Sequence, residues 1–130
     1  MSIVKNFLNR KAVSATVKVP FPPDNPEIVF EIARFSEVEK HSAFNIAVAV
    51  SRQHPAQAEA LFGLEYASGV FKILERHVKG WDKVSDDAPE FSRENLSVLW
   101  KSLDSLSGSA LVNAYYEACR ADEEAHAKNG

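Results

Sequence analysis

The longest apolar stretch of the chain lies between residues 55 and 78, and its spacing is helical. Its large side chains recur every three or four residues in two neighbouring stripes, one made of Leu61, Leu64, Phe71, Leu74 and Val78, the other of Phe62, Tyr66, Val70 and Ile73. Two adjacent stripes form an apolar arc that is wider than one neighbour covers. We therefore expect a central helix from Pro55 to Val78, ending before Gly80, that offers apolar surface to its own chain or to a partner.

Two segments before residue 36 alternate between apolar and polar side chains, which is the period of a β-strand. The apolar positions are Val13, Ala15, Val17, Val19 and Phe21, and then Ile28, Phe30 and Ile32. Residues 20–26 between them contain four prolines, which exclude regular structure there. This pattern predicts a β-hairpin with a long tip. A hairpin alone is barely stable in water, so it leans on the helices or pairs with another subunit. Residues 3–9 are predicted to form a short amphipathic helix.

Helix boundaries follow from capping residues. Ser36 and Glu39 have the spacing of a capping box, and the helix that they open should end near Gln53. Ser92 is predicted to cap a later helix with an apolar face of Leu96, Leu99, Trp100, Leu103 and Leu106. Residues 107–109 (Ser-Gly-Ser) should separate that helix from a last one, whose buried side would be Leu111, Val112, Tyr115 and Ala118. The polar end from residue 120 onward should fray.

These elements predict a mainly α fold of about four or five helices with an N-terminal β-hairpin; an all-α fold is the alternative. With 130 residues, the chain is expected to be one domain spanning residues 1–130. Residues 12–35 would form the hairpin part, 36–126 the helical part and 127–130 a frayed tail.

Composition limits the classes of partner. The net charge is −3 and the basic residues are scattered, so we expect no nucleic-acid partner. No segment approaches the roughly 20 apolar residues of a membrane span, and no apolar run of signal-peptide length stands at the start. A single cysteine, Cys119, fits a reducing compartment. We therefore expect a soluble protein that contacts no membrane.

Candidate catalytic chemistry is sparse. None of the four histidines lies in a zinc-protease motif, and His77 is best explained as a residue at a helix C-terminus. No serine lies in a nucleophile elbow, no glycine-rich loop is placed to bind phosphate, and Cys119 is predicted to be buried. We expect no enzyme activity, no cofactor and no metal site.

The aromatic residues and the second apolar stripe are the candidates for partner binding. Trp100 lies on a leucine stripe and is predicted to be a core residue. Trp81 either plugs the core or anchors a partner in a desolvated pocket. The predicted partner-binding residues are Phe62, Tyr66, Val70, Ile73 and Trp81. The periodicity leaves open which stripe faces the core.

Two segments carry a resemblance to a known family. Residues 78–84 (Val-Lys-Gly-Trp-Asp-Lys-Val) precede an acidic link, which leads into residues 89–96 (Pro-Glu-Phe-Ser-Arg-Glu-Asn-Leu) and a later Ala114-Tyr115. Together with the hairpin and its proline-rich tip, this arrangement resembles the tail assembly chaperones of long-tailed (siphovirus-type) bacteriophages or prophages. The resemblance covers most of the chain.

The resemblance implies a non-catalytic protein of the host cell cytoplasm that acts during virion assembly. It would bind the tape measure protein, keep the long apolar helices of that protein soluble and recruit tail tube subunits, and it would be absent from the mature virion. Family members are often made in two lengths through a ribosomal frameshift. Residues 127–129 (Ala-Lys-Asn) can be encoded by a slippery run, so a frameshifted longer form of the chain is a further expected partner.

Self-association is also expected, because a second copy could cover the spare apolar arc or extend the edge of the hairpin. Two other functions stay open. The chain could be a structural minor tail or connector protein, which would remain in purified particles. It could also be a cytoplasmic helical adaptor unrelated to phage, in which case no tube-protein and tape-measure genes would flank its gene.

Overall fold

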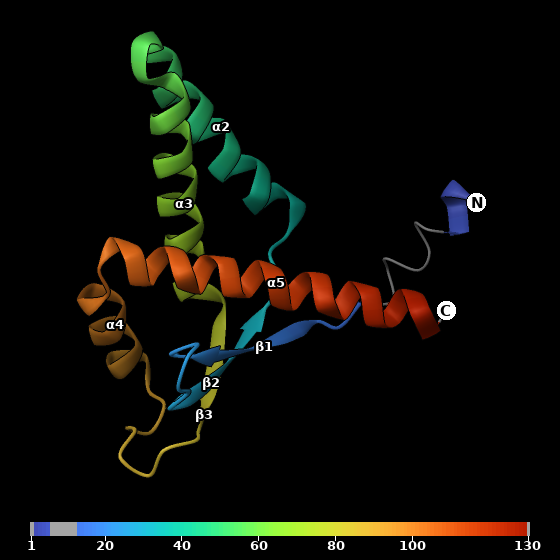
Figure 1. The fold of residues 1–130 in the computed structure, drawn as a ribbon, viewed down its shortest axis with the longest axis vertical. Coiled ribbons are helices and arrows are strands. Elements are labelled where there is room, and N and C mark those ends of the chain that lie inside the picture. Colours follow the sequence, from blue (N-terminus) through green and yellow to red (C-terminus); the bar gives the residue numbers. More distant parts are fainter. Residues whose placement is uncertain (1, 6–12, 130) are drawn as a thin grey trace.

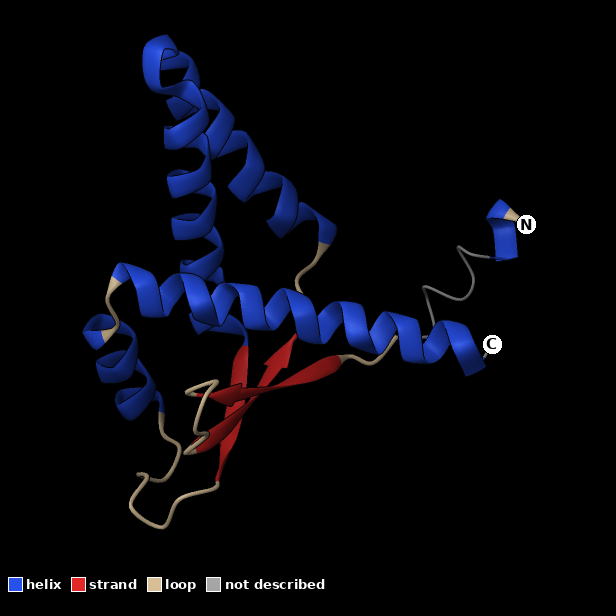
Figure 2. Cartoon of the chain, in the orientation of Figure 1, coloured by secondary structure: helices blue, strands red, loops and turns tan. Residues whose placement is uncertain are grey.

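A computed structural model describes residues 2–5 and 13–129, with side chains as far as Ala127. This part of the chain is mainly helical and contains one three-stranded antiparallel sheet (Figure 2). The elements, in chain order, are β1 (Thr16–Phe21), β2 (Ile28–Ala33), α2 (Glu37–Gln53), the 3-10 helix η1 (Pro55–Gln57), α3 (Ala58–His77), β3 (Val78–Lys83), α4 (Arg93–Ser102) and α5 (Ser105–Asn129). The mainly helical prediction is confirmed, and the all-α alternative is wrong. Of the short helix predicted over 3–9, residues 3–5 are helical and 6–9 lie outside the described residues.

The predicted hairpin is present as β1 and β2, which pair antiparallel from Thr16 opposite Ala33 to Phe21 opposite Ile28. Its inward positions match the alternation: Val17, Val19, Ile28, Phe30 and Ile32 are all buried. The proline-rich tip between the strands has no regular structure, as its missing N–H donors require.

The third strand was not predicted. Residues 78–83 were expected to finish the central helix and then to break, whereas they form β3 and pair antiparallel with β2. A shift in register brings Gly80 opposite Glu31 but Val78 opposite Ile32, so Lys79 is an extra residue in β3. Val78 and Trp81 consequently both face the core although they are three residues apart. Because of this irregularity, the sequence of β3 does not show the two-residue alternation by which a strand is recognised. The bulge and the exposed Lys79 and Lys83 also protect this edge strand against pairing with another chain.

The first two long helices begin and end where their caps predict. Ser36 and Glu39 form the complete capping box of α2, which ends at Gln53. Pro55 opens η1, and α3 runs directly on from it. Ala43 and Ala47 of α2 are buried, whereas Ile46 is exposed.

The boundary between the last two helices differs from the prediction. Ser92 caps α4 as expected, but α4 ends at Ser102 and α5 begins at Ser105, so the Ser-Gly-Ser triplet lies inside a helix. Asp104 caps α5 by accepting a hydrogen bond of 2.7 Å from the backbone N–H of Ser107. Gly108 lies inside α5, where a Cβ would touch the ring of Phe71 on α3, 3.4 Å from Cε1. The glycine marks a packing contact and not a helix end.

The expected fraying of the C-terminal end is wrong, since α5 continues to Asn129. Arg34, just after β2, fastens the helix end. Its Nε donates to the carbonyl of Ser14 at 2.8 Å, and its Nη2 donates to the carbonyl of Cys119 at 3.2 Å and to Oδ2 of Asp122 at 2.7 Å. We call Arg34, Asp122 and Ser14 the clamp.

One cluster of buried side chains joins the inner face of the sheet to α3, α4 and α5. Trp100 is in the core as predicted, and its indole N–H donates to the carbonyl of Phe71 at 2.8 Å. Cys119 is buried as expected, and burial raises the pKa of its thiol, which makes it unreactive. In the described part of the chain, no helix is long and apolar enough to cross a membrane.

Candidate partner-binding surface

Helices α2 and α3 form an antiparallel hairpin that projects away from the sheet and from α5 (Figure 1). We call this hairpin the arm. Helix α2 packs mainly on α3, and its only buried residues are Ala43 and Ala47. Helix α3 is buried only toward its C-terminal half, at Val70, Ile73 and Leu74. The outer part of the arm therefore lacks a core of its own.

Two of the five predicted partner-binding residues lie on this outer part of the arm. Phe62 and Tyr66 are partly exposed, stack on each other with ring centroids 5.9 Å apart, and meet Phe44 of α2 edge-on. The Tyr66 hydroxyl lies 3.4 Å from that of Tyr116, so this aromatic cluster reaches α5.

The other three predicted residues are core residues. Val70 and Ile73 are buried in the core cluster, so they have almost no exposed surface for a partner. Trp81 is 9% exposed and packs edge-on against Phe30 and Phe91. Trp81 thus lies in the core, and it also lines a hollow near the hairpin tip.

The exposed apolar side chains of the arm were not among the predicted partner-binding residues. They are Val38, Phe44, Ile46 and Leu64, of which Phe44 is 47% and Leu64 67% exposed. Leu64 belongs to the stripe that contains the buried Leu74, but α5 leaves it largely uncovered. Helical periodicity identifies the apolar face of a helix, but it does not show how far along the helix other elements cover that face. Only the folded chain therefore shows that these residues are exposed.

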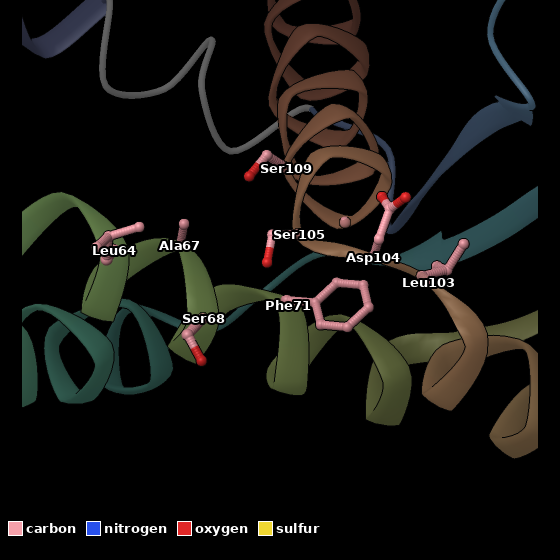
Figure 3. Close-up of a pocket in the computed structure, with 9 residues that line it drawn as sticks. Leu64, Ala67, Ser68, Phe71, Leu103, Asp104, Ser105 and Ser109 are labelled. Carbon is pink, nitrogen blue, oxygen red and sulfur yellow. The ribbon is translucent and has the colours of Figure 1, made fainter.

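Beside Leu64, a hollow of about 210 Å³ opens between α3 and the start of α5 (Figure 3). One wall consists of Leu64, Ala67, Ser68 and Phe71 on α3, and the other of Leu103, Asp104, Ser105, Gly108 and Ser109. Small-molecule pockets usually measure about 300–1,000 Å³. A hollow of this size accommodates a side chain or two of a protein partner better than it accommodates a cofactor.

The one carboxylate that lines the hollow, that of Asp104, is engaged in helix capping. The hydrogen bond from the backbone N–H of Ser107 is the main cause that lowers the pKa of Asp104, which is consistent with a capping carboxylate. No group of three His, Cys, Asp or Glu side chains among residues 2–5 and 13–127 is placed to hold a metal ion.

Ser14, Asp122 and His126 also come together, at the end of α5, as a serine hydrolase triad would require. Their geometry is different. Ser14 Oγ donates directly to Oδ1 of Asp122 at 2.7 Å, and one nitrogen of His126, Nε2, lies 3.3 Å from Ser14 Oγ and 3.5 Å from the same carboxylate oxygen. In a triad the imidazole stands between the serine and the acid and uses both nitrogens. These residues therefore extend the clamp that holds α5.

Comparison with protein families, with curated proteins and with solved structures returns no match for this chain.

Proposed function

We propose that this chain is a tail assembly chaperone of a long-tailed bacteriophage or prophage, and that its arm binds the tape measure protein. The observation that carries the proposal is that an arm with almost no core of its own exposes the apolar side chains of Val38, Phe44, Ile46 and Leu64. The sequence resemblance supplies the identity of the partner. In this proposal the chain acts in the host cytoplasm, recruits tail tube subunits and is absent from the finished virion.

The dimensions of the arm suit an amphipathic helical partner. With 20 residues, α3 is about 30 Å long at 1.5 Å per residue. An amphipathic helix docks in an apolar groove through anchors spaced three, four and seven residues apart. Leu64, which is largely exposed beside the hollow, provides a contact for such an anchor.

The test is co-expression of the full chain with the tape measure protein of the same phage. We expect the chain to keep that protein soluble and to co-purify with it. Leu64→Glu should weaken the complex by about tenfold or more, because burial of a leucine side chain stabilises by about 1.5–3 kcal/mol.

Val98→Glu is the matched control, since Val98 is 61% exposed on α4, away from the arm. It should leave the complex unchanged, and circular dichroism should show equal helicity for both variants. Equal binding by the two variants would contradict the assignment of the arm. Recovery of the chain in purified particles would instead favour a structural tail protein.

A further inference from the structure

The negative charge of the chain is concentrated at the end of the sheet away from the arm. Residues 20–28, around the hairpin tip, and residues 82–95, which run from the end of β3 to the start of α4, together carry seven acidic and two basic residues. The whole chain has 18 acidic and 15 basic residues, so the remainder has a basic excess. Figure 1 shows the tip and the link at the same end of the molecule.

A second hollow, of about 180 Å³, lies between these two segments. Its floor is apolar and includes Phe21, Ile28, Trp81 and Leu99, and its rim includes Glu27 and Asp87. The volume far exceeds the roughly 10–15 Å³ that one water molecule needs and is smaller than most cofactor sites. It suits one bulky apolar side chain.

The walls of this hollow are fixed by hydrogen bonds from the backbone and from the indole. The backbone N–H groups of Val84 and Ser85 donate to the carbonyl of Glu27 at 2.8 and 3.1 Å, which ties the link to the tip. The indole N–H of Trp81 donates to the carbonyl of Pro89 at 2.9 Å. A site formed in advance requires little ordering when a ligand binds.

The carboxylates on the rim are available to a ligand. Among the described residues, neither Glu27 nor Asp87 has an ion-pair partner, although Lys83 and Arg93 lie in the same segment. An acidic rim repels nucleic acid and favours cationic groups.

We propose that this hollow docks a basic segment of a partner protein. One bulky apolar side chain of the segment fills the floor beside Trp81 and Leu99, and lysines or arginines on either side of it pair with Glu27 and Asp87. The apolar anchor provides affinity, and the charges select the partner and accelerate encounter. This site lies apart from the arm, so the inference does not rest on the proposed function.

The two tryptophans allow a direct test by NMR. The full chain is labelled with ¹⁵N and titrated with a short capped peptide that has two lysines on each side of one leucine. The indole resonance of Trp81, in the floor, should shift and saturate, while that of Trp100, bonded to Phe71 in the core, should stay in place.

The double variant Glu27→Lys/Asp87→Lys should weaken binding of the peptide by about tenfold, which corresponds to roughly 1.4 kcal/mol. Neither side chain takes part in a described hydrogen bond, so the fold should persist. Glu59→Lys/Glu65→Lys on α3 changes the net charge equally and should leave the affinity within about twofold, as expected for screened distant charges.

Three outcomes would overturn the inference. If a peptide with serine in place of leucine bound equally well, charge alone would explain the binding of the peptide and the apolar floor would have no role. Joint movement of the Trp100 and Trp81 resonances would indicate a general rearrangement. A shift of the Trp81 resonance on dilution of the protein without peptide would make a second copy of the chain the occupant.

Discussion

The Glu39 carboxylate connects three elements of the fold. It accepts a hydrogen bond from the backbone N–H of Ser36 at 3.0 Å and so closes the capping box of α2. Its other oxygen lies 2.6 Å from Nε2 of His77 at the end of α3, and Nδ1 of His77 lies 3.1 Å from the carbonyl of Ala33 on β2. This one contact chain fixes the base of the arm against the sheet.

Acid is expected to destabilise the protein through Glu39 and Asp122. The hydrogen bond from the backbone of Ser36, and then the one from His77, lower the pKa of Glu39 from 4.5 to about 2. Burial raises the pKa of Asp122, but the hydrogen bond from Arg34 and others outweigh it and lower the pKa from 3.8 to about 2. Stabilisation by a carboxylate with a depressed pKa is complete above its unfolded pKa and is lost as the pH falls through the folded value. The free energy of unfolding in urea should therefore fall between about pH 4.5 and pH 2.

Glu39→Gln should lower the free energy of unfolding by about 1 kcal/mol at pH 7 and flatten its dependence on acid. The control is Glu31→Gln, which removes the exposed pair with Lys18 on the solvent face of the sheet. Its effect should stay below about 0.5 kcal/mol. Equal losses in both variants would refute the structural role of Glu39.

At the scale of elements, small side chains bring α2 close to α3. A Cβ at Gly69 would lie 3.4 Å from Cβ of Ala43, so the two helices approach closely at this glycine. Gly63, two turns earlier in α3, faces open space, with nothing within 4 Å of such a Cβ. The two glycines of this helix therefore differ in their surroundings: Gly69 is packed against α2, and Gly63 is not.

Substitution of leucine at each glycine position tests this difference. Gly69→Leu should destabilise the protein by about 1–3 kcal/mol, because the larger side chain pushes α2 away from α3. Gly63→Leu should stabilise it by up to about 1 kcal/mol, because glycine costs that much in a helix interior. Thermal unfolding of both variants measures the difference, and destabilisation by Gly63→Leu would show that the outer arm is more tightly packed than described.

At the scale of the whole molecule, the chain consists of a well-covered body and a sparsely covered arm. The body contains the sheet, α4 and α5 around one buried cluster, whereas only alanines are buried along α2. Segments with few buried apolar contacts open at lower free energy than the core.

Hydrogen exchange should resolve this difference. Amides of α2 between Ala43 and Val50 should exchange at least about tenfold faster than those of β2, which is a gap of roughly 1.4 kcal/mol in opening free energy. If α2 and β2 showed the same opening free energy, the division into body and arm would be incorrect. A bound tape measure helix should slow exchange in α2 and leave β2 unchanged.

Local patterns determined much of the fold. The alternation in Val17, Val19, Phe30 and Ile32 gave the hairpin, and the box that begins at Ser36 gave the start of α2, because both depend on neighbours in the chain. The apolar arc of the central helix was likewise readable, and Phe62 and Tyr66 from it do reach the surface of the arm.

Only the tertiary structure decided where that arc is covered and where it is left open. β3 forms because β2 supplies the backbone groups with which it pairs, and a bulge hides the two-residue period of its apolar side chains. The polar end of α5 stays helical because Arg34, some 90 residues earlier, reaches Asp122. In the same way Leu74 is buried while Leu64 of the same stripe is exposed, because the rest of the chain covers only one end of α3. Contacts between distant segments set these outcomes, and no local period encodes them.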